Sequence, residues 1–173
     1  MDNLILDNFN GTNENLASQS AEEIIDFLTL KHHEYLKVEL PRVVKLSYTI
    51  RRVHGETHPE LHEVEKTFKV IGEQIEDYIQ VEESRFFPNI KESKRLNLGD
   101  SLEVMEVVAN DLKNSQINIK EGFEKLKGQT SNNVAPDDGC ETFDLTYKLY
   151  SDIEAVINNM FHIENRYLFP KII

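Results

Sequence analysis

Apolar residues recur at intervals of three and four along almost the whole chain. This spacing places them on one face of an α-helix, which repeats every 3.6 residues. No stretch rich in Val, Ile or Thr alternates apolar and polar residues for long enough to indicate a sheet. The pattern therefore predicts an all-α fold with four long helical segments.

The first segment is predicted to begin at Ser20 and to run to about Val53. Ser20 can cap the free backbone N–H groups, and Glu23, three residues later, completes the sequence signature of a capping box. Pro41 lies inside the segment and is expected to kink it. The face expected to point inward carries Leu30, His33, Leu36, Leu40, Val43, Ser47, Ile50 and His54.

The second segment is predicted to begin near Pro59 and to end near Pro88, because proline is favourable in a first helical turn and breaks a helix further on. Its inward face carries Leu61, Val64, Phe68, Ile71, Ile75, Tyr78, Glu82 and Arg85 or Phe86. A loop at 97–101 follows.

The third segment is predicted from about Leu102 to near Gly128, and the fourth follows a turn-rich loop at 130–139. Their inward faces include Ala109, Gln116, Ile119, Tyr150, Met160 and Glu164. Short connections between neighbours favour an antiparallel up-down-up-down four-helix bundle over residues 20–173. Residues 1–19 are expected to form a polar N-terminal arm.

Composition narrows the classes of partner. The chain of 173 residues carries 31 acidic and 19 basic residues, a formal net charge of −12. Such a chain would repel nucleic acid and anionic membranes, so neither is expected to be a partner. No signal peptide or membrane span is recognised, and the single Cys140 cannot form an internal disulfide. We therefore expect a cytoplasmic location.

One short pattern occurs twice. The stretch Tyr78-Ile-Gln-Val-Glu-Glu-Ser-Arg-Phe-Phe-Pro-Asn-Ile90 aligns without a gap with Met160-Phe-His-Ile-Glu-Asn-Arg-Tyr-Leu-Phe-Pro-Lys-Ile172. Glu82 then falls on Glu164, and both lie on apolar faces. An ionised carboxylate in a core must be compensated by a cation or by hydrogen-bond donors. Two carboxylates from facing helices together with a histidine are typical of non-haem iron and manganese sites in bundles.

Less specific explanations remain open for these residues. Each glutamate could pair with Lys, Arg or Tyr or reach water at a rim, and the repeated Phe-Pro could simply end two helices. His33, on the inward face, could be a hydrogen-bonded core residue. His54, His58 and His62 surround the first turn, where solvated side chains are common, and His162 should point away from the inward face. Cys140 could be a helix-start nucleophile, although a small buried thiol is the simpler interpretation.

The chain resembles the hemerythrin-like (HHE) domain of the repair of iron centres (RIC) family of di-iron proteins. The resemblance covers about residues 22–172. It is carried by His33-Glu-Tyr-Leu-Lys-Val-Glu-Leu-Pro41, Arg52-Val-His-Gly-Glu-Thr-His-Pro-Glu-Leu61, Glu82-Glu-Ser-Arg-Phe-Phe-Pro-Asn-Ile90, Ala135-Pro-Asp-Asp-Gly-Cys140 and His162-Ile-Glu-Asn-Arg-Tyr-Leu-Phe-Pro170. It implies an antiparallel four-helix bundle with an iron site and a role in the stress response to nitrosative and oxidative damage of iron-sulfur clusters. The family's cysteine-bearing N-terminal domain is expected to be absent.

The resemblance also implies which ligands are kept. The family's helix-one histidine falls on His33, and its two bridging glutamates fall on Glu82 and Glu164. The other three histidine positions are occupied by Tyr78, Met160 and either Ala109 or, if the alignment slips by one residue, Asn110. The inward face favours Ala109. The reduced set could hold one iron, manganese or zinc ion rather than two irons, with Tyr78, His54 and Met160 as possible additional ligands. Dioxygen, peroxide or nitric oxide would be the expected small-molecule partners.

Three other outcomes stay open at this stage. The paired glutamates could share a proton or bond to Tyr78 without any metal. A cavity left by the lost histidines could admit haem between His33 and Met160. The chain could also be a metal-free bundle that acts as an interaction or regulatory protein with a protein partner.

Overall fold

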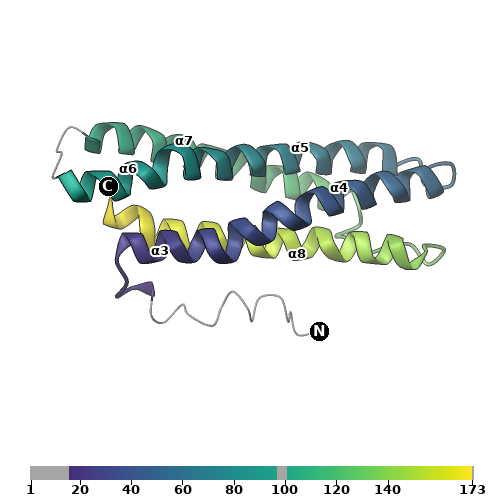
Figure 1. The fold of residues 1–173 in the computed structure, drawn as a ribbon. Coiled ribbons are helices and arrows are strands. Elements are labelled where there is room, and N and C mark those ends of the chain that lie inside the picture. Colours follow the sequence, from purple (N-terminus) through teal and green to yellow (C-terminus); the bar gives the residue numbers. More distant parts are fainter. Residues whose placement is uncertain (1–15, 97–100, 173) are drawn as a thin grey trace.

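The computed structural model describes residues 16–96 and 101–172, and these residues form a bundle of helices (Figure 1). The elements are α3 (Ala21–Leu28), η1 (Thr29–His33), α4 (Glu34–His54), α5 (Leu61–Val81), η2 (Glu82–Phe86), α6 (Phe87–Leu96), α7 (Ser101–Gln129), α8 (Glu141–Ile163), η3 (Glu164–Leu168) and η4 (Phe169–Lys171). The elements η1, η2 and η3 are π-helical turns, and η4 is a short 3₁₀ helix. The all-α prediction is confirmed for the described residues.

The first long segment consists of α3, η1 and α4. The predicted capping box is present: the Glu23 backbone N–H donates to Ser20 Oγ, and the Ser20 backbone N–H donates to the Glu23 carboxylate. Leu30 is 69% exposed, so the prediction that it points inward is wrong. The reason is the π-helical turn η1, which is wider than an α-turn and shifts the inward face. Pro41 lies within α4, which continues to His54.

The second long segment consists of α5, η2 and α6, and it continues past Pro88 to Leu96. The prediction that Pro88 ends this segment is wrong. Phe87 N–H donates to the carbonyl of Glu82, which closes the wide π-helical turn just before the proline. Pro88, which has no N–H, therefore lies where the backbone hydrogen bonds change from the π-helical to the α-helical pattern. The helix continues beyond it as α6.

The third and fourth long segments are α7 and α8 with η3 and η4. A turn-rich loop joins them, and three consecutive residues in it, Ser131, Asn132 and Asn133, have positive φ values of 50°, 62° and 60°. Asparagine tolerates this left-handed conformation better than most residues. The fourth segment contains the second copy of the repeated Phe-Pro. There, Phe169-Pro170 opens the short η4, and the helix ends soon after. The repeated Phe-Pro therefore ends only one of its two helices.

Packing between the segments places the candidate residues inside. α5 contacts α4 and α7, α4 contacts α8, and α3 contacts η3 and α6. Figure 1 shows the chain reversing between α4 and α5 and again between α7 and α8. Buried side chains from every long segment form one core, including Leu36, Phe68, Ile119 and Ile153. Within the described part of the chain, no helix is both long enough and apolar enough to cross a membrane.

Two expectations fall outside the described residues. Most of the predicted N-terminal arm, 1–15, and most of the loop at 97–101 are not described. The division into an arm and a bundle stays a prediction. Leu16, the first described residue, is fully buried in the core.

Candidate metal centre

Each of the three π-helical turns carries one candidate ligand. η1 ends at His33, η2 begins at Glu82 and η3 begins at Glu164. All three side chains are fully buried. Isolated π-helical turns inside α-helices occur frequently at functional sites because the extra residue redirects side chains. The burial predicted for both repeated glutamates is thus confirmed, and each one opens a turn of unusual geometry.

Two consecutive glutamates of η2 hold the imidazole of His33. His33 Nδ1 lies 2.9 Å from Glu83 Oε1, and His33 Nε2 lies 3.1 Å from Glu82 Oε2. Lys37 Nζ donates to both oxygens of Glu83, at 2.7 and 2.9 Å. The His33 ring also stacks on Phe87, with ring centroids 5.6 Å apart. A carboxylate that fixes one nitrogen of a histidine is the usual support for a metal ligand acting through the other nitrogen.

The beginning of η3 forms a matching arrangement around Gln116. Gln116 Nε2 donates to Glu164 Oε2 at 2.8 Å and to the Tyr78 hydroxyl oxygen at 2.9 Å. Tyr78 donates its hydroxyl hydrogen to the same Glu164 oxygen at 2.5 Å. Asn165 Nδ2 donates to Gln116 Oε1 and to the Phe161 carbonyl, both at 2.7 Å. Tyr78 therefore bonds to Glu164, which is the contact expected in one of the alternatives that the sequence left open.

Burial governs the protonation of these groups. Burial first, and then the charge of Glu83, hold the pKa of Glu82 well above its usual range. Burial and the charge of Glu82 likewise raise the pKa of Glu164, while the donors Tyr78 and Gln116 act in the opposite direction. Burial lowers the pKa of His33. The centre therefore favours neutral carboxyl groups beside a neutral imidazole unless a cation enters.

Two oxygen atoms in this centre lack any partner. Oε1 of Glu82 and Oε1 of Glu164 are buried and accept no hydrogen bond from the described residues. Leaving a buried polar group unsatisfied costs about 1–3 kcal/mol, and more for a charged group. The two carboxyl groups also influence each other electrostatically, as the pKa of Glu164 responds to Glu82 and to His33. A proton or a metal ion bound by these oxygens would relieve both defects.

The donors present do not fit two metal ions. Only one histidine reaches the centre, and no group of three or more His, Cys, Asp and Glu side chains among residues 16–96 and 101–172 has the arrangement of a metal site as it stands. One imidazole nitrogen and two carboxylates are nevertheless a donor set that suits a single iron, manganese or zinc ion. The residues fit one ion, provided that hydrogen bonds around His33, Glu82 and Glu164 are exchanged for bonds to the metal.

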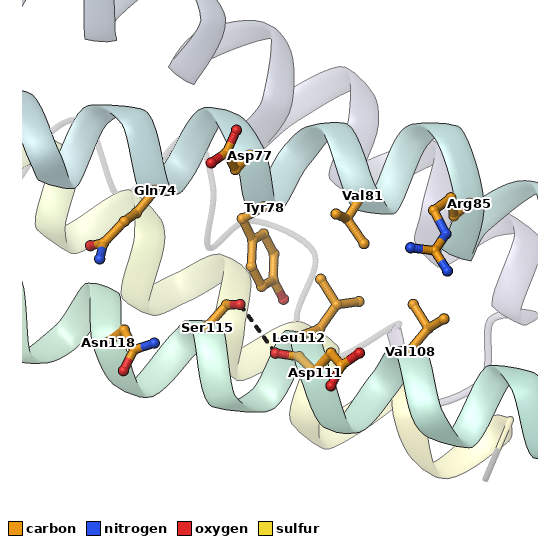
Figure 2. Close-up of a pocket in the computed structure, with 10 residues that line it drawn as sticks. All are labelled: Gln74, Asp77, Tyr78, Val81, Arg85, Val108, Asp111, Leu112, Ser115 and Asn118. Carbon is orange, nitrogen blue, oxygen red and sulfur yellow. Dashed lines mark hydrogen bonds between the residues drawn. The ribbon is translucent and has the colours of Figure 1, made fainter.

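A cavity of about 210 Å³ lies between α5 and α7 and reaches Tyr78. Figure 2 shows the Tyr78 ring extending from α5 toward α7, with Arg85 further along the same segment, in η2. Apolar side chains of Val81, Val108 and Leu112 line the cavity. Tyr78 is itself buried and bonds to Glu164, so it connects the lining of this cavity to one of the buried carboxylates.

The structure does not bring His54 to this centre. His54 ends α4, 21 residues after His33, which corresponds to roughly 30 Å along a helix. Its Nε2 lies 3.2 Å from the sulfur of Cys140, and its ring contacts Phe143. Helical spacing preserves a face but not a depth, so two residues on one face can lie at opposite ends of the bundle. Cys140 is exposed before α8, so the expectation of a buried thiol is wrong.

The other two positions at which the resemblance implies a lost histidine are buried in the bundle. Met160 is fully buried one turn before Glu164, and Ala109 is fully buried on α7. Neither residue carries a nitrogen or oxygen side-chain donor, so their positions contribute no hydrogen bond to the carboxylates. His162 is exposed, as the sequence predicts.

Three residues of the site were missed by sequence reasoning: Glu83, Gln116 and Asn165. Gln116 was placed on an inward face, and a glutamine among apolar positions was the signal that could have identified it. Glu83 and Asn165 each follow a repeated glutamate, but in an ordinary α-helix an adjacent residue points elsewhere. The π-helical turns that bring them to the site leave no mark in the spacing of apolar residues.

Known proteins similar to this chain are named for iron-sulfur cluster repair. The chain is 24% identical over 153 residues to the iron-sulfur cluster repair protein ScdA of Staphylococcus epidermidis, covering 88% of this chain and 67% of that protein. It is 22% identical over 166 residues to ScdA of Staphylococcus haemolyticus, covering 96% and 73%. It is 24% identical over 160 residues to the iron-sulfur cluster repair protein YtfE of Yersinia pestis, covering 92% and 69%.

No family model matches the chain. The similarity to ScdA and YtfE nevertheless extends over most of its length in each comparison. At 22–24% identity, the chain is a distant homologue of iron-sulfur cluster repair proteins, which supports a relationship to the RIC family.

Proposed function

We propose that the chain is a RIC-like protein that binds a single non-haem iron ion through His33, Glu82 and Glu164 and acts in the response to nitrosative or oxidative damage of iron-sulfur clusters. The observation that carries this proposal is the pair of buried, unpartnered Oε1 atoms on Glu82 and Glu164 beside His33. The names of the homologues supply the link to iron-sulfur cluster repair. The proposed setting is the cytoplasm.

The residues of the centre have distinct tasks in this proposal. Glu83, held by Lys37, accepts a hydrogen bond from His33 Nδ1 and so directs Nε2 toward the interior. Glu82 and Glu164 supply negative charge in a place that water does not reach, which favours a cation over empty space. When bound, the iron ion would supply an open position for redox chemistry or a source of iron for a damaged cluster.

Tyr78 has a different role from the one that a phenolate ligand would have. Burial first, and then the charges of Glu164 and Glu82, raise the pKa of Tyr78 well above its usual value. The hydroxyl group therefore stays protonated and donates to Glu164 rather than binding iron. The cavity next to its ring is a route by which dioxygen, peroxide or nitric oxide would approach. Met160 offers only a thioether, which is a weak ligand for iron.

The direct test is elemental analysis of untagged protein before and after anaerobic addition of ferrous iron. We expect about one iron per chain in the wild-type protein and none in Glu82→Ala or Glu164→Ala. Glu76→Ala, which removes an exposed carboxylate from the same helix α5, is the matched control and should retain wild-type iron. Equal iron in Glu82→Ala and the wild type would contradict the proposal.

The link to cluster repair needs its own test. An iron-sulfur enzyme inactivated with nitric oxide would be incubated with the iron-loaded protein, and recovery of its activity would be followed. We expect recovery with the wild type and with Glu76→Ala, and loss of recovery with Glu164→Ala. If enzyme activity recovers equally well with Glu164→Ala, the repair activity does not require this centre.

A second candidate function is a metal-free bundle that acts on a protein partner. It is favoured by one observation: Tyr78 and Gln116 already give Glu164 two hydrogen bonds without any cation. In this case a proton shared by the two carboxyl groups would take the place of the ion. Wild-type protein that binds no iron even after anaerobic reconstitution would support this second function over the first.

A further inference from the structure

We infer that Gln116, in addition to the presence of a single histidine, limits this centre to one metal ion. Together with Tyr78 it occupies one oxygen of Glu164 with hydrogen bonds, and it leaves the other oxygen as the only one free to bind. This inference rests on the proposed function, because it concerns how many ions the same centre accepts. Gln116 acts through Glu164, so it is a positioning residue and not a ligand.

The hydrogen bonds around Glu164 Oε2 leave little room for a second cation. A carboxylate oxygen accepts through two lone pairs. Gln116 Nε2 lies 2.8 Å from this oxygen and Tyr78 Oη lies 2.5 Å from it, so both lone pairs are used. The second hydrogen of the Gln116 amide goes to Tyr78 Oη at 2.9 Å. A cation at this oxygen would have to displace two hydrogens, one from Gln116 Nε2 and one from Tyr78 Oη.

The direction of the Gln116 amide is fixed from outside. Asn165 Nδ2 donates to Gln116 Oε1 at 2.7 Å, and only the carbonyl oxygen of an amide can accept this bond. The NH₂ group must then point toward Tyr78 and Glu164. Asn165 is itself held by the carbonyl of Phe161 at 2.7 Å. The donor character of this side of the centre is therefore imposed by a chain of bonds that begins near the surface.

The other carboxyl oxygens of the centre have the reverse character. Glu82 Oε2 meets His33 Nε2, and the Oε1 atoms of Glu82 and Glu164 have no partner. Unsatisfied acceptor oxygens therefore remain on Glu82 and Glu164, whereas hydrogen-bond donors from Gln116 and Tyr78 surround Glu164 Oε2. Ala109, also fully buried, adds no ligand atom from α7. One ion can bind to the unpartnered oxygens. A second ion would meet the donor hydrogens of Gln116 and Tyr78 at Glu164 Oε2 instead of a free ligand atom.

The test replaces the donor by an acceptor of the same shape. Gln116→Glu removes the NH₂ group and adds a carboxylate beside Glu164 Oε2. We expect anaerobic loading with ferrous iron to rise from one ion per chain in the wild type to two in Gln116→Glu. Asn114→Asp adds the same charge to an exposed position of α7 and should stay at one. One ion per chain in Gln116→Glu would overturn the inference.

A second variant covers the case in which Gln116→Glu fails to fold. Asn165→Ala changes an exposed residue and removes the bond that fixes the Gln116 amide, together with the bond from Asn165 to the Phe161 carbonyl. We expect its Kd for ferrous iron, measured by competition with a chromogenic chelator, to rise about 10–100-fold, the usual effect of losing a residue that orients a ligand. An unchanged Kd, with an unchanged far-ultraviolet circular dichroism spectrum, would overturn the role of Gln116 as a positioning residue.

The two proposals fail in different ways. If the wild type binds no iron, the proposed function and this inference both fall. If the wild type binds one ion, and either Gln116→Glu also binds one or Asn165→Ala binds as the wild type does, only the inference falls.

Discussion

Glu83 and Asn165 hold equivalent positions in two π-helical turns, and each bonds to the same partner as the buried glutamate before it. Glu83 and Glu82 both contact His33, at 2.9 and 3.1 Å. Asn165 and Glu164 both contact Gln116, at 2.7 and 2.8 Å. In each copy of the internal sequence repeat, two consecutive side chains thus hydrogen-bond to one shared partner. The two copies differ in what they hold: an imidazole in one and an amide in the other.

Glu82→Gln is expected to stabilise the metal-free protein as the pH rises. Burial raises the pKa of Glu82 well above the ordinary value of 4.5, so the folded state keeps a proton that the unfolded state releases. The stability from this group is complete below about pH 4.5 and is lost as the pH rises through the folded pKa. Urea unfolding from about pH 5 to about pH 9 should show the advantage of Glu82→Gln growing with pH. A constant difference would contradict the buried, protonated carboxyl group.

His32 is expected to make the protein sensitive to acid. Burial lowers its pKa from 6.5 to about 4, and its Nε2 donates to Asn159 Oδ1 at 2.8 Å. The folded state then binds fewer protons than the unfolded state, so this contribution is complete above pH 6.5 and is lost as the pH falls toward about 4. Over this window the loss is about 3 kcal/mol.

The measurement for His32 compares variants, because Glu82 and Glu164 change stability in the opposite direction. His32→Gln should have a smaller loss of unfolding free energy between about pH 6.5 and about pH 4 than the wild type. Parallel curves for the two proteins would show that His32 does not titrate differently in the folded state.

Glu83→Gln is expected to weaken iron binding without preventing it. Glu83 fixes His33 Nδ1 and is in turn held by Lys37 Nζ at 2.7 Å. Losing such a support typically lowers metal affinity about 10–100-fold. The matched control is Glu34→Gln, because Glu34 Oε1 lies 3.5 Å from Nζ of the same lysine on an exposed side chain, whereas His33 Nδ1 bonds to Glu83. Equal losses in both variants would point to the charge near Lys37 rather than to the orientation of His33.

Two glycines of α7 test the packing between α5 and α7. A Cβ at Gly122 would lie 2.8 Å from Ile71 Cγ1, whereas a Cβ at Gly128 would meet nothing within 4 Å. Gly128→Ala should stabilise the protein by up to about 1 kcal/mol through helix propensity. Gly122→Ala should lie about 1–3 kcal/mol below it, because the core there must shift. Thermal unfolding of the two variants measures this difference, and equal stabilities would contradict the close approach of the two helices.

The periodicity of apolar residues was sufficient to predict the fold class and most helix limits. The Ser20 cap, the loop before Glu141 and the inward positions of Glu82 and Glu164 all follow from local rules, and the structure confirms them. Leu30 and Pro88 were misjudged for one shared reason. Each lies in or next to a π-helical turn, and rules based on an α-helix cannot anticipate an extra residue in the turn.

The candidate site was only partly visible in the sequence. Its charged residues stood out because a carboxylate on an apolar face demands an explanation. Gln116 did not, since an amide is common at the edge of a core, and its importance comes from the orientation that Asn165 imposes. His54 was placed on the correct face of its helix but at the wrong end of the bundle, because a repeat along one helix fixes direction and not depth.

The three π-helical turns also bear on how such a centre changes over generations. Each turn is equivalent to one residue added to an α-helix, and each carries one of His33, Glu82 and Glu164. Losing a single codon within a turn would restore a regular helix and swing one ligand out of the centre. A one-residue deletion in such a turn can therefore abolish the site even though the codons for His33, Glu82 and Glu164 are all retained.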